Sequence, residues 1–249
     1  WGRAWGGGDV APFPLRRAAD DRMTKRLPAP VPACGTKKHR RSMDTQTLVR
    51  LLDLTGIAVF ALSGALMAVR LRQTLVTASF FALVTGVGGG SVRDLLIGAP
   101  VFWVQDGAIG AVCIAIALVV WVTPERWWQG QLLEWADAVG LAAYAVFGTA
   151  KALAWGVAPV PALMMGVITG CVGGAIRDIL AGVPSIIMRP EIYVTAAALA
   201  SGLFLVLTWL GVATSVAAVA GAASGFVLRG AAIRWSLALP TYRGRPESR

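Results

Sequence analysis

Charged residues are scarce in this sequence. Asp, Glu, Lys and Arg make up only 14% of the 249 residues, whereas 56% are hydrophobic. A soluble globular domain carries roughly 25% charged residues. The shortage excludes a water-facing surface over most of the chain and indicates that much of the surface faces lipid.

Histidine and cysteine are nearly absent as well. His39 is the only histidine, and the three cysteines, Cys34, Cys113 and Cys171, are an odd number without metal-ligand spacing. These residues argue against zinc and haem sites, a Ser-His catalytic pair and a disulfide framework. We therefore expect no metal, no cofactor and no enzymatic activity.

Positive charge is concentrated at one end of the chain. Residues 1–42 carry +7 of the total charge of +10, are rich in Pro, Arg and Gly, and contain no apolar run long enough for a signal peptide. We predict a disordered tail and no nucleic-acid partner. Met43 is an alternative natural start, in which case the tail is not native. A native tail is expected to attract anionic membrane lipids weakly.

Apolar stretches long enough to cross about 30 Å of hydrocarbon recur seven times. They fall at about 51–69, 75–97, 106–122, 137–154, 160–181, 191–209 and 212–228. The sequence therefore predicts an all-α membrane protein, with one domain at residues 43–230 and a basic C-terminal tail at 231–249.

The first six spans form a duplicated unit. A shift of 84 residues without a gap superimposes many Gly, Asp, Arg and Pro residues. The coincident pairs include Asp53/Asp137, Gly56/Gly140, Gly64/Gly148, Gly86/Gly170, Gly89/Gly173, Arg93/Arg177, Asp94/Asp178, Gly98/Gly182 and Pro100/Pro184. Because each unit has three spans, the second copy enters the membrane from the opposite side. We predict inverted repeats at 51–122 and 135–209 and a seventh helix at 212–229 that braces the bundle.

The distribution of Lys and Arg between the loops predicts the orientation. Without the tail, one side receives only Arg50, and the other receives nine arginines: Arg70, Arg72, Arg126, Arg189, Arg229, Arg234, Arg243, Arg245 and Arg249. We expect the protein in the inner membrane of the cell, and the positive-inside rule then places its C-terminus in the cytoplasm. With the tail included the tally is eleven against nine, and the rule decides nothing.

Spans two and five each carry a glycine run followed by a charged pair. The candidate pore and kink residues are Gly88, Gly89, Gly90, Ser91, Gly170, Gly173 and Gly174, and the charged pairs are Arg93-Asp94 and Arg177-Asp178. Glycine weakens a helix by about 1 kcal/mol relative to Ala, and Arg or Asp at mid-membrane costs roughly 2.5–3.5 kcal/mol. We predict that both spans kink or break, release carbonyls and line a polar path near the midplane.

Structural alternatives remain open for these residues. The glycines can serve close helix packing alone, and the Arg-Asp pairs can form a network that locks the repeats together. Lys151 stands where the first repeat has Met67 and is either a functional asymmetry or a lysine that reaches the membrane face. Asp53 and Asp137 begin their predicted spans, which favours helix capping.

The paired signatures resemble those of a known family. They read Gly88-Gly89-Gly90-Ser91-Val92-Arg93-Asp94 and Gly173-Gly174-Ala175-Ile176-Arg177-Asp178. Each lies on the middle span of a three-span repeat, as in the prokaryotic trimeric intracellular cation (TRIC) channels, which are grouped with bacterial membrane proteins described as glycine transporters. The resemblance covers about residues 46–230.

This resemblance implies a homotrimer with a pore inside each protomer, where spans two and five meet, and conduction of monovalent cations, chiefly K⁺. It implies that the glycine runs and Arg-Asp pairs are kink and pore elements, and Lys151 resembles a lysine on span four of that family. Val172 stands where the first repeat has Gly88, so we expect a milder break there. We expect a K⁺ channel that contacts membrane lipid and can bind it. The alternatives are a carrier of a small zwitterion such as glycine and a structural scaffold.

Overall fold

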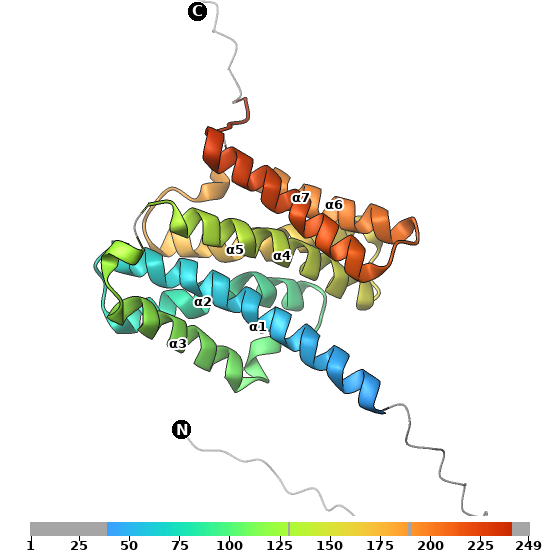
Figure 1. Ribbon diagram of the computed structural model, residues 1–249, viewed down its shortest axis with the longest axis horizontal. Helices are drawn as coiled ribbons and strands as arrows, with labels where there is room; N and C mark the ends of the chain where they lie inside the picture. Colours follow the sequence, from blue (N-terminus) through green and yellow to red (C-terminus); the bar gives the residue numbers. More distant parts are fainter. Residues whose placement is uncertain (1–38, 129, 189–190, 241–249) are drawn as a thin grey trace, which may run out of the picture.

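The protein is a bundle of α-helices. The computed structural model describes residues 39–128, 130–188 and 191–240 (Figure 1). Within these residues the seven α-helices are α1 (His39–Arg70), α2 (Leu75–Leu96), α3 (Gly107–Val122), α4 (Leu132–Ala154), α5 (Pro159–Leu180), α6 (Val194–Trp209) and α7 (Thr214–Trp235). The all-helical fold predicted from the apolar stretches is confirmed.

The helix boundaries differ from the predicted spans at both ends of the bundle. Helix α1 begins at His39, so residues 39–42 are helical and not part of a disordered tail. Helix α7 continues to Trp235, so residues 231–235 belong to it and not to the C-terminal tail. The remainder of the predicted tails, 1–38 and 241–249, lies outside the described residues.

The length and apolarity of the helices fit a membrane. Four segments of at least 18 residues are apolar enough to cross it: Asp53–Arg70, Leu75–Leu96, Pro159–Leu180 and Thr214–Trp235. Helices α3 and α6 are shorter and apolar, and α4 is long but carries Glu134, Asp137 and Lys151. Large apolar side chains such as Trp209 and Val76 are mostly exposed, as lipid-facing residues are. The chain is a membrane protein.

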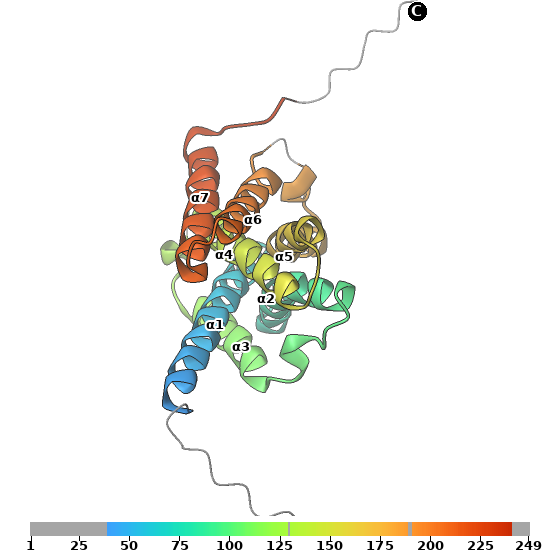
Figure 2. The same ribbon diagram turned by 90° about the vertical axis from the view of Figure 1, so that its right-hand side faces the viewer.

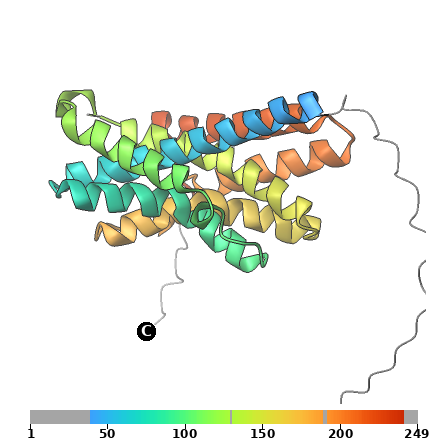
Figure 3. The same cartoon turned by 90° about the horizontal axis from the view of Figure 1, so that it is seen from below.

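The two halves of the bundle run in opposite directions. In Figure 1, α1 runs from right to left and α4 from left to right, and the helices alternate in between. Figure 2 shows the first three helices in the lower half and the last four in the upper half. Figure 3 shows that all of them follow roughly one long axis. The predicted inverted repeat is therefore present in three dimensions.

Equivalent turns of the two repeats have the same local geometry. Gly98 and Gly182 both have φ of +68°, a left-handed conformation that glycine adopts without strain after a helix end. The amide of Ala99 donates to the carbonyl of Asp94, and the amide of Val183 donates to that of Asp178. The coincidence of these glycines in the sequence thus reflects a shared helix-ending turn.

Helix α7 is anchored to the second repeat by a buried arginine. It packs on α4 and α6. Arg229 is 1% exposed, donates from Nη2 to Glu191 at 2.8 Å and lies over the Tyr193 ring at 5.3 Å. Arg229 was predicted to lie in a loop, but it lies inside α7. The predicted bracing role of the seventh helix has its physical basis in these contacts.

Candidate functional site

The glycine runs bring α2 and α5 into backbone contact. A Cβ added at Gly89 would overlap the carbonyl oxygen of Thr169, and one added at Gly173 would lie 2.6 Å from the carbonyl oxygen of Thr85. Positions 85 and 169 are equivalent in the repeat, as are positions 89 and 173, so the two contacts are related by the symmetry of the repeat. The helices therefore cross at Gly89 and Gly173, where only glycine fits.

Of the two predicted outcomes at the glycine runs, a kink or a break, the break is wrong and the kink stays a prediction. Both α2 and α5 continue as α-helix through their glycine runs, so the backbone carbonyls stay within the helical hydrogen-bond pattern and are not released as ligands. The physical reason is that close packing against the partner helix offsets the low helix propensity of glycine. Val172 does not make the second helix different in this respect.

The remaining glycines pack against other side chains and helices. A Cβ at Gly90 would lie 2.6 Å from the Phe102 ring, and one at Gly170 would lie 2.8 Å from the carbonyl oxygen of Leu141 in α4. At Gly174 a Cβ would lie 2.8 Å from the Tyr193 hydroxyl. Gly88 is less confined, because its nearest neighbour is the end of the Ile176 side chain at 3.1 Å.

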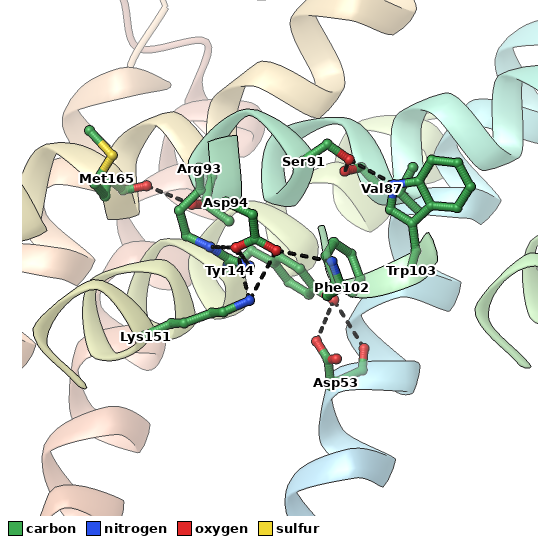
Figure 4. Close-up of polar contacts among 11 residues, drawn as sticks. Asp53, Val87, Ser91, Arg93, Asp94, Phe102, Trp103, Tyr144, Lys151 and Met165 are labelled. Carbon is green, nitrogen blue, oxygen red and sulfur yellow. Dashed lines mark hydrogen bonds and ion pairs between the residues drawn. The ribbon is translucent and has the colours of Figure 1, made fainter. Parts of the chain in front are cut away.

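One charged cluster lies at the C-terminal end of α2 (Figure 4). Arg93 donates to Oδ1 of Asp94 from Nε at 2.9 Å and from Nη2 at 2.8 Å. Lys151 of α4 reaches the same carboxylate, with Nζ 2.8 Å from Oδ1 and 3.0 Å from Oδ2. Arg93 and Asp94 are buried, whereas the Lys151 side chain is 22% exposed. One carboxylate thus serves two cations, and Lys151 joins the two repeats.

The same carboxylate also orders the turn that follows α2. Oδ2 of Asp94 accepts the backbone N–H of Phe102 at 3.2 Å. Ser91 donates to the carbonyl of Val87 and accepts the indole N–H of Trp103 at 2.9 Å. The hydroxyl of Ser91 therefore binds the loop after α2, a contact that the sequence did not predict.

A second charged cluster lies at the C-terminal end of α5. Arg177 donates to Oδ1 of Asp178 at 2.9 and 2.8 Å, to Oδ1 of Asp137 at 2.7 Å and to the Ser63 hydroxyl at 3.0 Å. Oδ2 of Asp178 accepts the N–H of Ile186 at 2.8 Å, as Asp94 does with Phe102. The side chains that form this cluster are all buried, namely those of Arg177, Asp178, Asp137 and Ser63. This cluster has two carboxylates for one cation.

The two clusters lie on opposite sides of the helix crossing. Arg93 follows Gly89 by four residues and Arg177 follows Gly173 by four, which is about 6 Å along each helix axis. Because α2 and α5 run in opposite directions, these displacements point to opposite ends of the bundle. The Arg-Asp pairs therefore flank the crossing and do not meet at a single depth.

The capping role predicted for Asp53 and Asp137 is wrong, because both residues lie within their helices and not at the N-caps. Asp137 is a partner of Arg177, whereas Asp53 accepts a hydrogen bond from the Tyr144 hydroxyl at 2.9 Å. The coincidence of Asp53 with Asp137 in the repeat was the signal that could have indicated a role beyond helix capping for both residues.

The fold and these clusters define a class of protein, namely an inverted-repeat membrane protein with a buried charged cluster on each side of a glycine crossing. A family model described as "Glycine transporter" matches residues 50–125 and 134–209, which are the two repeats. A membrane protein of Vibrio cholerae serotype O1 is 38% identical over 222 residues, which cover 85% of this chain and 92% of that protein. The inner membrane protein YadS of Escherichia coli K12 is 39% identical over 199 residues, or 78% of this chain and 96% of YadS.

A solved structure has the same fold. The TRIC trimeric intracellular cation channel orthologue from Rhodobacter sphaeroides is 40% identical, and the match covers 77% of this chain and all of that one with a TM-score of 0.71. The chain therefore belongs to the prokaryotic TRIC family, whose repeats the "Glycine transporter" model describes.

Proposed function

We propose that this protein is a channel for monovalent cations, chiefly K⁺, with a conducting path in each protomer beside the crossing of α2 and α5. The observation that carries the proposal is the buried charged cluster on each side of that crossing, in a chain 40% identical to a TRIC cation channel. Burying charge in a membrane protein is costly, and such residues usually mark an ion pathway.

The carboxylates supply the attraction for a cation, and the bound arginines hold them in place. The described part of the chain has a tight crossing at Gly89 and Gly173, where an added Cβ would meet the backbone of the other helix. Conduction therefore requires α2 and α5 to separate at the glycines or the ion to pass beside them. Lys151 binds the Asp94 carboxylate that an entering cation would approach. Its side chain is partly exposed, so its ammonium group competes with the cation for this carboxylate.

The homotrimer, the orientation and lipid binding are parts of the same proposal. A shallow apolar groove lined by Ala142 and Ala143 of α4 and by Ala222 and Ala223 of α7 supports contact with a second copy or a lipid chain, since small residues permit close helix packing. The loop arginines support a cytoplasmic C-terminus, and the majority remains eight against one when Arg229 is removed from the tally.

Single-channel recording of purified protein in planar bilayers tests the proposal. We expect discrete currents whose reversal potential in a KCl gradient lies near the K⁺ equilibrium potential, with K⁺ and Na⁺ both permeant and Cl⁻ nearly excluded. A mock preparation from cells that do not express the protein serves as the control for contaminating channels. The absence of discrete currents at every applied potential would contradict the proposal.

A glycine carrier is the second candidate, because the matching family model bears that description. Buried cations and carboxylates on the same path could bind the two ends of a zwitterion. Uptake of radiolabelled glycine by proteoliposomes separates the two candidates. Saturable uptake that alanine inhibits and K⁺ does not would favour the carrier, whereas uptake equal to that of protein-free liposomes would favour the channel.

A further inference from the structure

The two repeats pair equivalent residues differently, and the Asp-Arg pair of the second repeat indicates an alternative pairing for the first. In the second repeat Asp137 of α4 accepts from Nη1 of Arg177 of α5 at 2.7 Å. The equivalent pair in the first repeat is Asp53 of α1 and Arg93 of α2. Asp53 instead binds Tyr144, and Nη1 of Arg93 has no hydrogen-bond partner among the described residues.

A single hydroxyl accounts for this difference. Tyr144 is equivalent to Phe60, and the two rings pack edge to face with centroids 5.4 Å apart. The Tyr144 hydroxyl donates to the side chain of Asp53 at 2.9 Å and also lies 3.0 Å from its carbonyl oxygen (Figure 4). Phe60 has no hydroxyl with which to hold Asp137, so Asp137 is available to Arg177.

The environment of Arg93 leaves its unpartnered nitrogen without a substitute. Ser63, which accepts from Nη1 of Arg177, is equivalent to Phe147 in the other repeat. The Phe147 ring lies 5.5 Å from the Arg93 guanidinium, and the Phe102 ring lies 6.0 Å from it. Rings can attract the cation from their faces but cannot accept a strong hydrogen bond, so Nη1 lacks the partners that its counterpart has.

We infer that Asp53 has two alternative partners, Tyr144 and Arg93, and that the exchange between them controls cation passage at the Lys151 side of the crossing. This inference rests on the proposed function for its effect on current, but the exchange itself is a structural event. In the alternative state Asp53 binds Nη1 of Arg93 as Asp137 binds Arg177, while Arg93 keeps its two bonds to Asp94.

The exchange moves a negative charge toward the cluster that a permeating cation meets. In the described arrangement Asp94 alone binds Arg93 and Lys151, and the Tyr144 hydroxyl holds the Asp53 carboxylate. The four charges sum to zero in both states, but binding of Asp53 to Arg93 places its carboxylate directly against the guanidinium. A cation that approaches the cluster is then repelled less. The state with Asp53 on Arg93 is therefore the conducting one.

The Tyr144→Phe variant tests this inference with Thr149→Val as the matched control. Both changes remove one buried hydroxyl from α4, but among the described residues Thr149 donates only to the carbonyl of Ala145 on its own helix. Since the first repeat carries Phe60 at the equivalent position, a phenyl ring suits this backbone. We expect Tyr144→Phe to raise the K⁺ current through purified protein in bilayers by at least about threefold, and Thr149→Val to leave it unchanged.

The dependence on Asp53 identifies the cause. Asp53→Asn should lower the current of the wild-type protein, and the double variant Asp53→Asn/Tyr144→Phe should match Asp53→Asn alone. Equal gains from Tyr144→Phe in the presence and absence of the Asp53 carboxylate would overturn the inference.

An experimental structure of the Tyr144→Phe variant tests the exchange without reference to current. We expect an Asp53 carboxylate oxygen within hydrogen-bond distance of Nη1 of Arg93. If Asp53 remains away from Arg93, the inference is wrong, whatever the currents. If the exchange occurs and neither protein conducts, the exchange stands and the proposed function fails.

Discussion

The Gly89→Ala variant is expected to lose stability although alanine is the better helix former. A methyl group at this position would overlap the carbonyl oxygen of Thr169, with the Thr169 carbonyl carbon at 3.0 Å and its Cα at 3.3 Å. These are backbone atoms of α5 and cannot rotate away. Overpacking of this kind typically costs about 1–3 kcal/mol and sometimes more, which exceeds the gain of about 1 kcal/mol in helix propensity. Thermal unfolding of the detergent-solubilised protein measures the effect.

The adjacent Gly88→Ala variant is the matched control for this prediction. Its added methyl group would meet the end of the Ile176 side chain at 3.1 Å, and that side chain can move. We expect its midpoint of unfolding to equal or exceed that of the wild type. Equal midpoints for the two variants would show that the helices do not cross at Gly89.

The Arg177→Met variant is expected to be far less stable than Arg93→Met. Loss of Arg177 leaves Asp137 and Asp178 buried, and the described contacts of those carboxylates include no second cation. Removal of one partner of a buried ion pair costs about 3–5 kcal/mol. Loss of Arg93 leaves Asp94 paired with Lys151 and bonded to the Phe102 amide, so the cost should be smaller. The yield of folded protein and its midpoint of unfolding report the difference.

Two further variants identify the source of the instability. Arg177→Lys keeps the charge but loses the forked contacts, and it should fall between wild type and Arg177→Met. Asp137→Asn in the Arg177→Met background removes one of the uncompensated charges and should restore part of the stability. A stability loss in Arg93→Met as large as that in Arg177→Met would show that Lys151 does not compensate Asp94.

Much of the fold could be predicted because a membrane imposes long apolar segments and the chain contains its own duplicate. The shift that superimposes Arg93 on Arg177 and Gly98 on Gly182 correctly predicted equivalent helices and turns. The costs of burying Arg and Asp also pointed to the two Arg-Asp pairs, and the structure shows that both pairs are buried. Lys151 was identified by its departure from the repeat, and the structure adds that its partner is Asp94.

The details that failed depend on contacts between segments far apart in the chain. A glycine run weakens an isolated helix, but whether it breaks depends on the partner helix, and here the backbone of α5 fills the space beside Gly89. Likewise, Asp53 and Asp137 are alike in sequence, and only the position of the Tyr144 hydroxyl separates their roles. Local propensity contains neither kind of information.

The most direct test of the central claim is the current through a Lys151→Cys variant before and after its thiol is modified. Replacing the partly exposed lysine removes a positive charge beside Asp94, so the K⁺ current should rise by about two- to tenfold. A methanethiosulfonate that adds an aminoethyl group restores a lysine-like cation and should return the current to the wild-type value, whereas an anionic reagent should not. The same treatment of wild-type protein controls for its buried cysteines, Cys113 and Cys171. Modification confirmed by mass spectrometry without any change in current would contradict a cation path at this cluster.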